Sequence, residues 1–392
     1  MSVAEDLELD VDTLADFFSK EDIVSKAHAL EQTEREHRYR QLPENAPNFW
    51  RRVRKAATAV PREHRLALIA LACNTVYIFD ALLKGVLRQL ASKLSTLCQD
   101  LGVEISEVQI FTLDHPGLID DLYQVGGNYG WTARLDRSAE SGFRSIKEFV
   151  SALDSIGSSS SEQKAAIATV FSRRIWVFLA DNVLSGTSAS SDIKRAQELL
   201  TALVEPSKQP HIILCAEILT SKALNDKILK FVPQERILRG IFLDNRFSIS
   251  HTDCAMFNSE STLTSVRAFC EWFGKKHFSD APPPDESDPD KSKPHPLSEG
   301  LAVHSKQGRS DLAYGWADGG YTLVLQGNCP NNTEPALWYP CVGTEFQQES
   351  IYTPPFPRNP SRVKYRKSNT DEALQRVIKQ SAGIREIIGS RP

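Results

Sequence analysis

The stretch 175–188 holds the residue types best suited to bind a charged ligand. Its first six residues are apolar, the carboxylate of Asp181 follows, and a turn of small residues comes next. Such a turn offers backbone N–H groups and hydroxyls to one anion, and Gly186 permits the positive φ that an anion cradle needs. The turn consists of Ser185, Gly186, Thr187 and Ser188. The pattern indicates phosphate binding, and the alternative is an ordinary strand–turn–helix connection with a serine N-cap.

The elements around this turn alternate between strands and helices. Short apolar runs predict strands, and helical spacing of apolar residues predicts the helices between them. Such alternation is typical of a parallel sheet with right-handed crossovers, which binds ligands at the carboxyl ends of its strands. The predicted strands are 106–113, 175–180, 211–216 and 237–243, and the predicted helices are 143–156, 162–172, 191–204, 224–231 and 263–273.

The flanking segments predict further helices and one exposed insertion. Residues 7–41 and 49–101 show helical spacing, with an interruption near Pro61, and 370–388 forms a last helix. A strand at 321–325 could return to the main sheet. The expected organisation is an N-terminal helical arm (1–60), an α/β core (61–278), a flexible acidic proline-rich insertion (279–297), a core-completing strand and lid (298–368) and a C-terminal helix (369–392).

Composition excludes several classes of protein. The chain has 392 residues, 41% of them hydrophobic, and a formal net charge of −4, so it can bury large cores and does not coat nucleic acid over its whole surface. Its seven cysteines form no CxxC pair and its nine histidines no HExxH, which argues against a zinc site. The start lacks the layout of a signal peptide and no apolar run could span a membrane. We therefore expect a cytoplasmic protein without a membrane partner.

The stretch 175–188 resembles the PRPP-binding fingerprint of phosphoribosyltransferases. In that family two acids hold the ribose hydroxyls, the small-residue turn holds the 5′-phosphate, and an acid near the turn often acts as base. Here Ala180 stands at the first acid, Asp181 at the second, and Leu184 at the position of the base. The resemblance makes Asp181 the candidate catalytic residue and 185–188 the phosphate loop. It implies binding more strongly than transfer.

A narrower resemblance covers roughly residues 65–360. The order of the fingerprint, the strand 237–243, the proline-rich insertion, the segment 328–338 and the Phe-Pro-Arg element is similar to the PRTase-CE group, phosphoribosyltransferase-like proteins of bacterial conflict systems. The resemblance implies a phosphoribosyltransferase-like α/β fold with an N-terminal helical region and a C-terminal extension. Its further candidate binding residues are Asn331, Asn332, Trp338 and Arg358. For Trp338 the alternative is a core anchor, and for Arg358 a surface position.

These features leave three functions open. The first is an anti-phage effector that binds PRPP or a nucleotide and acts at ribose C1. The second is an inactive nucleotide sensor, favoured by Ala180 and Leu184. The third is a scaffold for other defence-system proteins or for a retron reverse transcriptase with its nucleic acid. No cofactor is firmly implied, and Mg²⁺ would accompany PRPP.

Three other segments carry weaker signals. Residues 111–117 correspond in position to the loop that takes pyrophosphate, and the glycine-rich stretch 126–131 departs from a dinucleotide motif. Two basic clusters, 50–55 and 358–367, could contact nucleic-acid phosphates, with Trp50 or Tyr365 stacking on bases. Solvated surface residues are the alternative for each.

Overall fold

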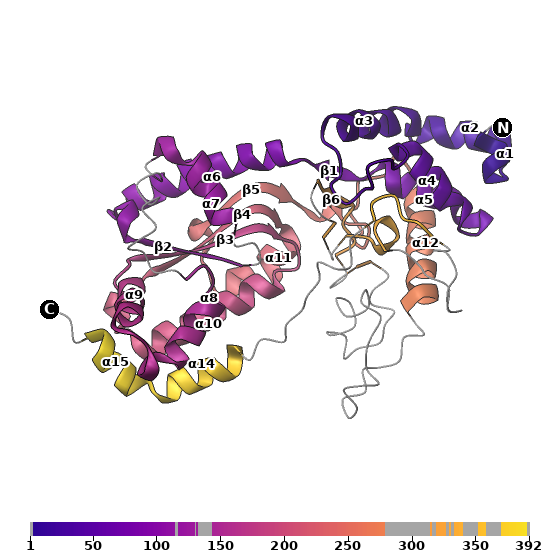
Figure 1. Cartoon of the computed structure of the whole chain (residues 1–392). Helices are drawn as coiled ribbons and strands as arrows, with labels where there is room; N and C mark the ends of the chain where they lie inside the picture. Colours follow the sequence, from indigo (N-terminus) through magenta and orange to yellow (C-terminus); the bar gives the residue numbers. More distant parts are fainter. Residues whose placement is uncertain are drawn as a thin grey trace, which may run out of the picture. The chain divides into compact units, whose positions relative to one another are not determined.

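The chain folds into two compact units, which are described separately. The computed structural model describes residues 3–113, 117–129, 131, 143–278, 314–315, 319–326, 329–330, 333–339, 352–357 and 370–389. The helical unit comprises Met1–Asp80 and Asp244–Tyr365, and the sheet unit comprises Ala81–Leu243 and Arg366–Pro392 (Figure 1). This grouping differs from the five predicted segments, because the predicted core 61–278 contributes to both units and the C-terminal helices belong with the sheet. The insertion 279–297 lies outside the described residues.

The sheet unit is built on four parallel strands in the order β2-β3-β4-β5. The strands are β2 (Val108–Thr112), β3 (Ile175–Val183), β4 (His211–Thr220) and β5 (Ile237–Leu243). All four strands were predicted, and β3 and β4 extend beyond their predicted ends at 180 and 216. The α/β class with a parallel sheet is thus confirmed.

Helices cover both faces of this sheet, as Figure 1 shows. Along β3, Ile175, Val177 and Leu179 pack in one core cluster, while Trp176 and Phe178 pack in the other. A strand buried on both faces needs apolar residues at every position, which explains the continuous apolar run. One cluster contains α6 (Asp80–Asp100) and α7 (Leu118–Val125); the other contains α8 (Ile146–Asp154), α9 (Ser161–Phe171), α10 (Thr187–Leu203), α11 (Ser221–Asp226), α14 (Thr370–Lys379) and α15 (Ser381–Gly389).

Ion pairs fasten the C-terminal helix α14 to the sheet unit. Arg376 binds the carboxylate of Asp154 on α8 at 2.6 Å, and Arg195 on α10 binds Asp371 at 2.6 Å. Leu374 and Val377 of α14 are buried in the same cluster as α8 and α10. The predicted helix 370–388 is observed as two helices that meet at Gln380.

The helical unit contains a small two-stranded sheet, of which the sequence predicted one strand, at 321–325. Its helices are α1 (Val3–Leu7), α2 (Val11–Lys20), α3 (Ile23–Glu36), α4 (Phe49–Thr58), α5 (Arg65–Cys73) and α12 (Glu260–Phe278). Strand β6 (Leu323–Leu325) pairs in parallel with β1 (Val76–Ile78). The expectation that 321–325 returns to the main sheet was therefore wrong. The continuous helical segment 49–101 was also wrong at β1, because three residues are too few to show a strand period between two apolar helices.

Gly85 gives a prediction for the stability of α6. A Cβ at this position would meet open space, so no packing requires glycine inside the helix. Because alanine loses less conformational entropy on folding, Gly85→Ala should stabilise the sheet unit by about 0.5–1 kcal/mol in urea denaturation. Gly240→Ala in β5 is the matched control: its Cβ would overlap the side chain of Val86, so it should destabilise. Equal effects of the two changes would contradict this account.

Candidate functional site

Asp181 lies within β3, near the carboxyl end of the strand. The strand continues to Val183, so Asp181 and Asn182 belong to the sheet and not to a loop. The Asp181 side chain is half-buried, and its carboxylate accepts a hydrogen bond from the Asn182 backbone N–H at 2.6 Å. The prediction that the strand ends at 180, with Asp181 in the loop after it, is therefore wrong, because β3 continues past Asp181 to Val183.

A second carboxylate, Glu217, occupies the neighbouring position on β4. The register pairs Ala180 with Ala216 and Asn182 with Ile218, which places Asp181 level with Glu217 on strands roughly 4.8 Å apart. Glu217 is buried. Glu217 was not among the predicted site residues, because the predicted strand ended at 216. The available signal was a single acid inside an apolar run.

Both strands change their facing pattern at this level. Ala180 and Val183 of β3 pack in the same core cluster although they are an odd number of residues apart. Ala216 and Leu219 of β4 do the same. Strict alternation would put each pair on opposite faces, so both strands carry a local irregularity around Asp181 and Glu217. The register nevertheless stays one-to-one, with Asn182 opposite Ile218 and Val183 opposite Leu219, so neither strand inserts an extra residue here.

The turn after β3 is held by the end of β4. Thr220 donates its hydroxyl to the Leu184 carbonyl at 2.7 Å and accepts the Ala223 N–H at 3.0 Å. Gly186 has φ of 73°, as expected from its predicted role. A Cβ on Gly186 would lie 3.2 Å from the Ala223 Cα. Gly186 is thus buried against α11, unlike a residue of an exposed loop.

Helix α10 begins directly after Gly186 and leaves its first turn open. It starts at Thr187, four residues before the predicted start, and Gly186 is the N-cap without a side-chain hydrogen bond. The Ser185 hydroxyl reaches the Thr187 N–H only at 3.4 Å. Thr187 and Ser188 are exposed. Their hydroxyls and the first-turn N–H groups are the groups that bind an anion at a helix N-terminus.

Lys227 adds a cation beside this turn. Its Cβ would be 3.1 Å from a Cβ placed on Gly186, and the residue is exposed. Among the residues that the structure describes, no carboxylate forms an ion pair with Lys227. Lys227 was not predicted, because no motif connects it to a turn 41 positions earlier.

Of the remaining predicted binding residues, Trp338 is described and belongs to the helical unit. Trp338 is buried and donates its indole N–H to the Thr333 carbonyl at 3.0 Å, an arrangement that favours the core-anchor alternative. Asn331, Asn332 and Arg358 lie outside the described residues. Their proposed contacts with a ligand stay predictions.

The first basic cluster has structural roles in part. Arg52 is buried, pairs with Glu34 and donates to the Pro355 carbonyl at 2.9 Å. Trp50 packs edge-on against Phe18 with ring centroids 5.8 Å apart. These two residues are therefore engaged within the helical unit. The second cluster, and residues 114–116 of the predicted pyrophosphate loop, lie outside the described residues.

Two carboxylates alone do not complete a metal centre. Within the described part of the chain, no group of three or more His, Cys, Asp and Glu side chains is placed to hold a metal ion. Carboxylate oxygens suit Mg²⁺, which usually takes one or two carboxylates together with substrate phosphates. Asp181 and Glu217 fit that requirement only as partners of a phosphorylated ligand.

The described helices include none that is long and apolar enough to cross a bilayer.

Comparison with known protein families shows to which family this chain belongs. The family model PRTase-CE matches residues 61–358. The chain belongs to the PRTase-CE family. This match spans β1 to β6 and includes the complete β3–α10 turn, so the PRTase-CE protein is phosphoribosyltransferase-like. Comparisons with curated proteins and with solved structures gave no match.

Proposed function

We propose that this PRTase-CE protein is an anti-phage defence effector that binds PRPP or a nucleotide at the β3–α10 turn. The open first turn of α10 carries the proposal: its N-cap is Gly186, and the hydroxyls of Thr187 and Ser188 are exposed. A phosphate placed there would accept from the first-turn N–H groups and gain from the helix dipole. Lys227 would supply a counter-charge.

The ribose would lie toward the strand end. An ionised Asp181 can accept hydrogen bonds from two ribose hydroxyls, which is the role that the family fingerprint gives to its acids. Glu217 is the neighbouring carboxylate and, with Asp181, would hold the Mg²⁺ of a PRPP complex. Action at ribose C1 would then break the bond between C1 and its substituent. In a transfer, the ribose would pass to another acceptor.

A nucleotide sensor is the second candidate, and two buried residues favour it. Ala180 and Leu184 occupy the positions of the first acid and the base, and both are almost fully buried. Neither side chain can move a proton. Without another base, binding would proceed without turnover.

Asp181 provides the test of the binding site. Asp181→Ala should weaken the binding of PRPP or ADP at least about tenfold in calorimetric titrations, because it removes charge-assisted hydrogen bonds to the ribose. Asp181→Asn should lose less affinity, since its amide oxygen still accepts hydrogen bonds.

Lys227→Ala should weaken the binding of ligands that carry a phosphate and leave the binding of ribose without phosphate unchanged. Asp100→Ala, an exposed acid at the end of α6, is the charge control.

Product analysis separates the two candidates. The wild-type protein is incubated with PRPP, NAD or nucleoside triphosphates and examined by mass spectrometry. An effector enzyme should give a product altered at ribose C1 that Asp181→Ala abolishes. Binding without any product would support the sensor. Affinity that is indifferent to Asp181→Ala would remove the site from both candidates and leave the scaffold function.

A further inference from the structure

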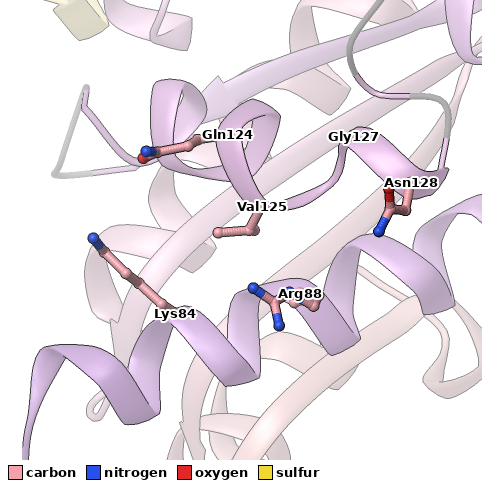
Figure 2. Close-up of a pocket in the computed structure, with 6 residues that line it drawn as sticks. All are labelled: Lys84, Arg88, Gln124, Val125, Gly127 and Asn128. Carbon is pink, nitrogen blue, oxygen red and sulfur yellow. The ribbon is translucent and has the colours of Figure 1, made fainter.

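We propose that the sheet unit holds a second ligand site, a polar pocket beside α6 that binds a nucleotide-sized phosphorylated small molecule. The pocket has a volume of about 520 Å³ and lies between α6 and the end of α7 with the short helix η3 (Gly127–Tyr129). Figure 2 shows Lys84 and Arg88 on α6, facing the segment that carries the other lining residues. These are Gln124, Val125, Gly127 and Asn128. None of the predicted site residues lines it.

Two cations give the pocket its charge. Lys84 and Arg88 are one helical turn apart on α6, and both are exposed. Within the described ranges neither forms an ion pair, and Asp80, one turn before Lys84, pairs with Arg40 instead. Like charges at this spacing on a helix repel one another. A bound anion would turn this repulsion into a favourable pair of contacts.

The wall opposite α6 is fixed by buried contacts. Ser95 of α6 donates its hydroxyl to the Tyr129 carbonyl at 3.0 Å, and the Trp131 indole N–H donates to the Ser95 hydroxyl at 2.9 Å. Trp131 is fully buried. A Cβ on Gly126 would come within 2.9 Å of the Trp131 ring, so only glycine permits this close turn. Gly126 and Trp131 thus position Gly127 and Asn128 opposite the two cations.

The chemistry of the lining selects the class of ligand. A guanidinium such as Arg88 binds a phosphate with two parallel hydrogen bonds, and an ammonium such as Lys84 acts as a point charge beside it. The side-chain amides of Gln124 and Asn128 offer both donors and acceptors, which suits the edge of a base. Pockets of this volume accommodate molecules of drug or nucleotide size, whereas a single phosphate ion would leave most of it empty.

Photolabelling of the full chain with 8-azido-ATP, together with calorimetric titration of ATP, tests the proposal. We expect labelled peptides that cover 84–88 or 124–128. The double variant Lys84→Gln/Arg88→Gln should lose this labelling and bind ATP at this site at least about tenfold more weakly. The matched control Lys164→Gln/Lys208→Gln removes the same charge from α9 and the turn 206–208, and should label like the wild type.

The outcomes separate this site from the β3–α10 turn. Asp181→Ala should leave the labelling of the pocket unchanged, so either site can fail without the other. Labelling of these peptides that persists in Lys84→Gln/Arg88→Gln, or is absent from the wild type, would overturn the proposal. A single-stranded oligonucleotide that competes at lower concentration than ATP would assign the cations to nucleic acid and would also overturn it.

Discussion

Gly186→Val should lower the stability of the sheet unit by roughly 2–4 kcal/mol, even without any ligand. Gly186 has φ of 73°, a conformation that a β-branched residue strongly resists. Its Cβ would also lie 3.2 Å from the Cα and the Cβ of Ala223, and the γ-carbons of valine would add to this crowding. We expect the melting temperature to fall by roughly 5–15 °C, as followed by circular dichroism.

Two matched variants check the cause of this loss. Gly186→Ala keeps the strained φ and adds only the Cβ, so its loss should be smaller than that of valine. Thr187→Ala changes the next residue, which is exposed, and should alter stability little. A Gly186→Val protein that melts within a degree of the wild type would show that the turn is not packed on α11. Because the glycine supports the fold, loss of ligand binding in its variants would not by itself identify a phosphate site.

The wild-type protein should lose stability as the pH rises, and Glu334→Gln should remove this loss. Glu334 is 0% exposed in the core of the helical unit, and among the described residues its two carboxyl oxygens have no hydrogen-bond partner. The Cys270 thiol and the Ala336 N–H lie near the carboxyl without meeting hydrogen-bond geometry. Burial therefore raises the pKa of Glu334 well above its ordinary value.

The sign of the pH dependence follows from the raised pKa of Glu334. Between the ordinary pKa of the unfolded chain, 4.5, and the raised pKa of the folded chain, the folded state binds the extra proton. The stability contributed by Glu334 is complete below the unfolded pKa and is lost as pH rises toward the folded pKa, by up to about 1.4 kcal/mol per pH unit. The difference in unfolding free energy between Glu334→Gln and the wild type should therefore increase in favour of the variant from pH 5 to pH 8.

Glu271→Gln is the control for Glu334. Glu271 is the neighbour of Cys270 in α12, is exposed, and accepts a hydrogen bond from the Tyr314 hydroxyl at 2.9 Å. The gain in stability from pH 5 to pH 8 should be larger for Glu334→Gln than for Glu271→Gln. Parallel pH profiles for Glu334→Gln and the wild type would contradict a neutral, buried Glu334.

Short-range pattern determined much of the sheet unit. Continuous apolar runs marked the first parts of β3 and β4, because strands that are buried on both faces exclude polar side chains. The same pattern gave the order of carboxylate, turn and helix, since these are adjacent in the chain, but β3 extends past Asp181 and α10 starts four residues before its predicted start. The match of residues 61–358 to PRTase-CE agrees with the resemblance seen in the motifs.

Tertiary structure alone decided what distant segments do to one another. The pairing of β1 with β6 joins segments about 250 residues apart, and neither three-residue strand has enough length to show its partner. Glu217 comes beside Asp181 through strand register, and Lys227 comes beside Gly186 through helix packing. Burial of Gly186 and Glu334 likewise depends on atoms that other elements supply. The local sequence pattern indicates which face of an element a residue prefers. The contacts of that residue, its burial and the charges beside it are decided only when separate elements pack together.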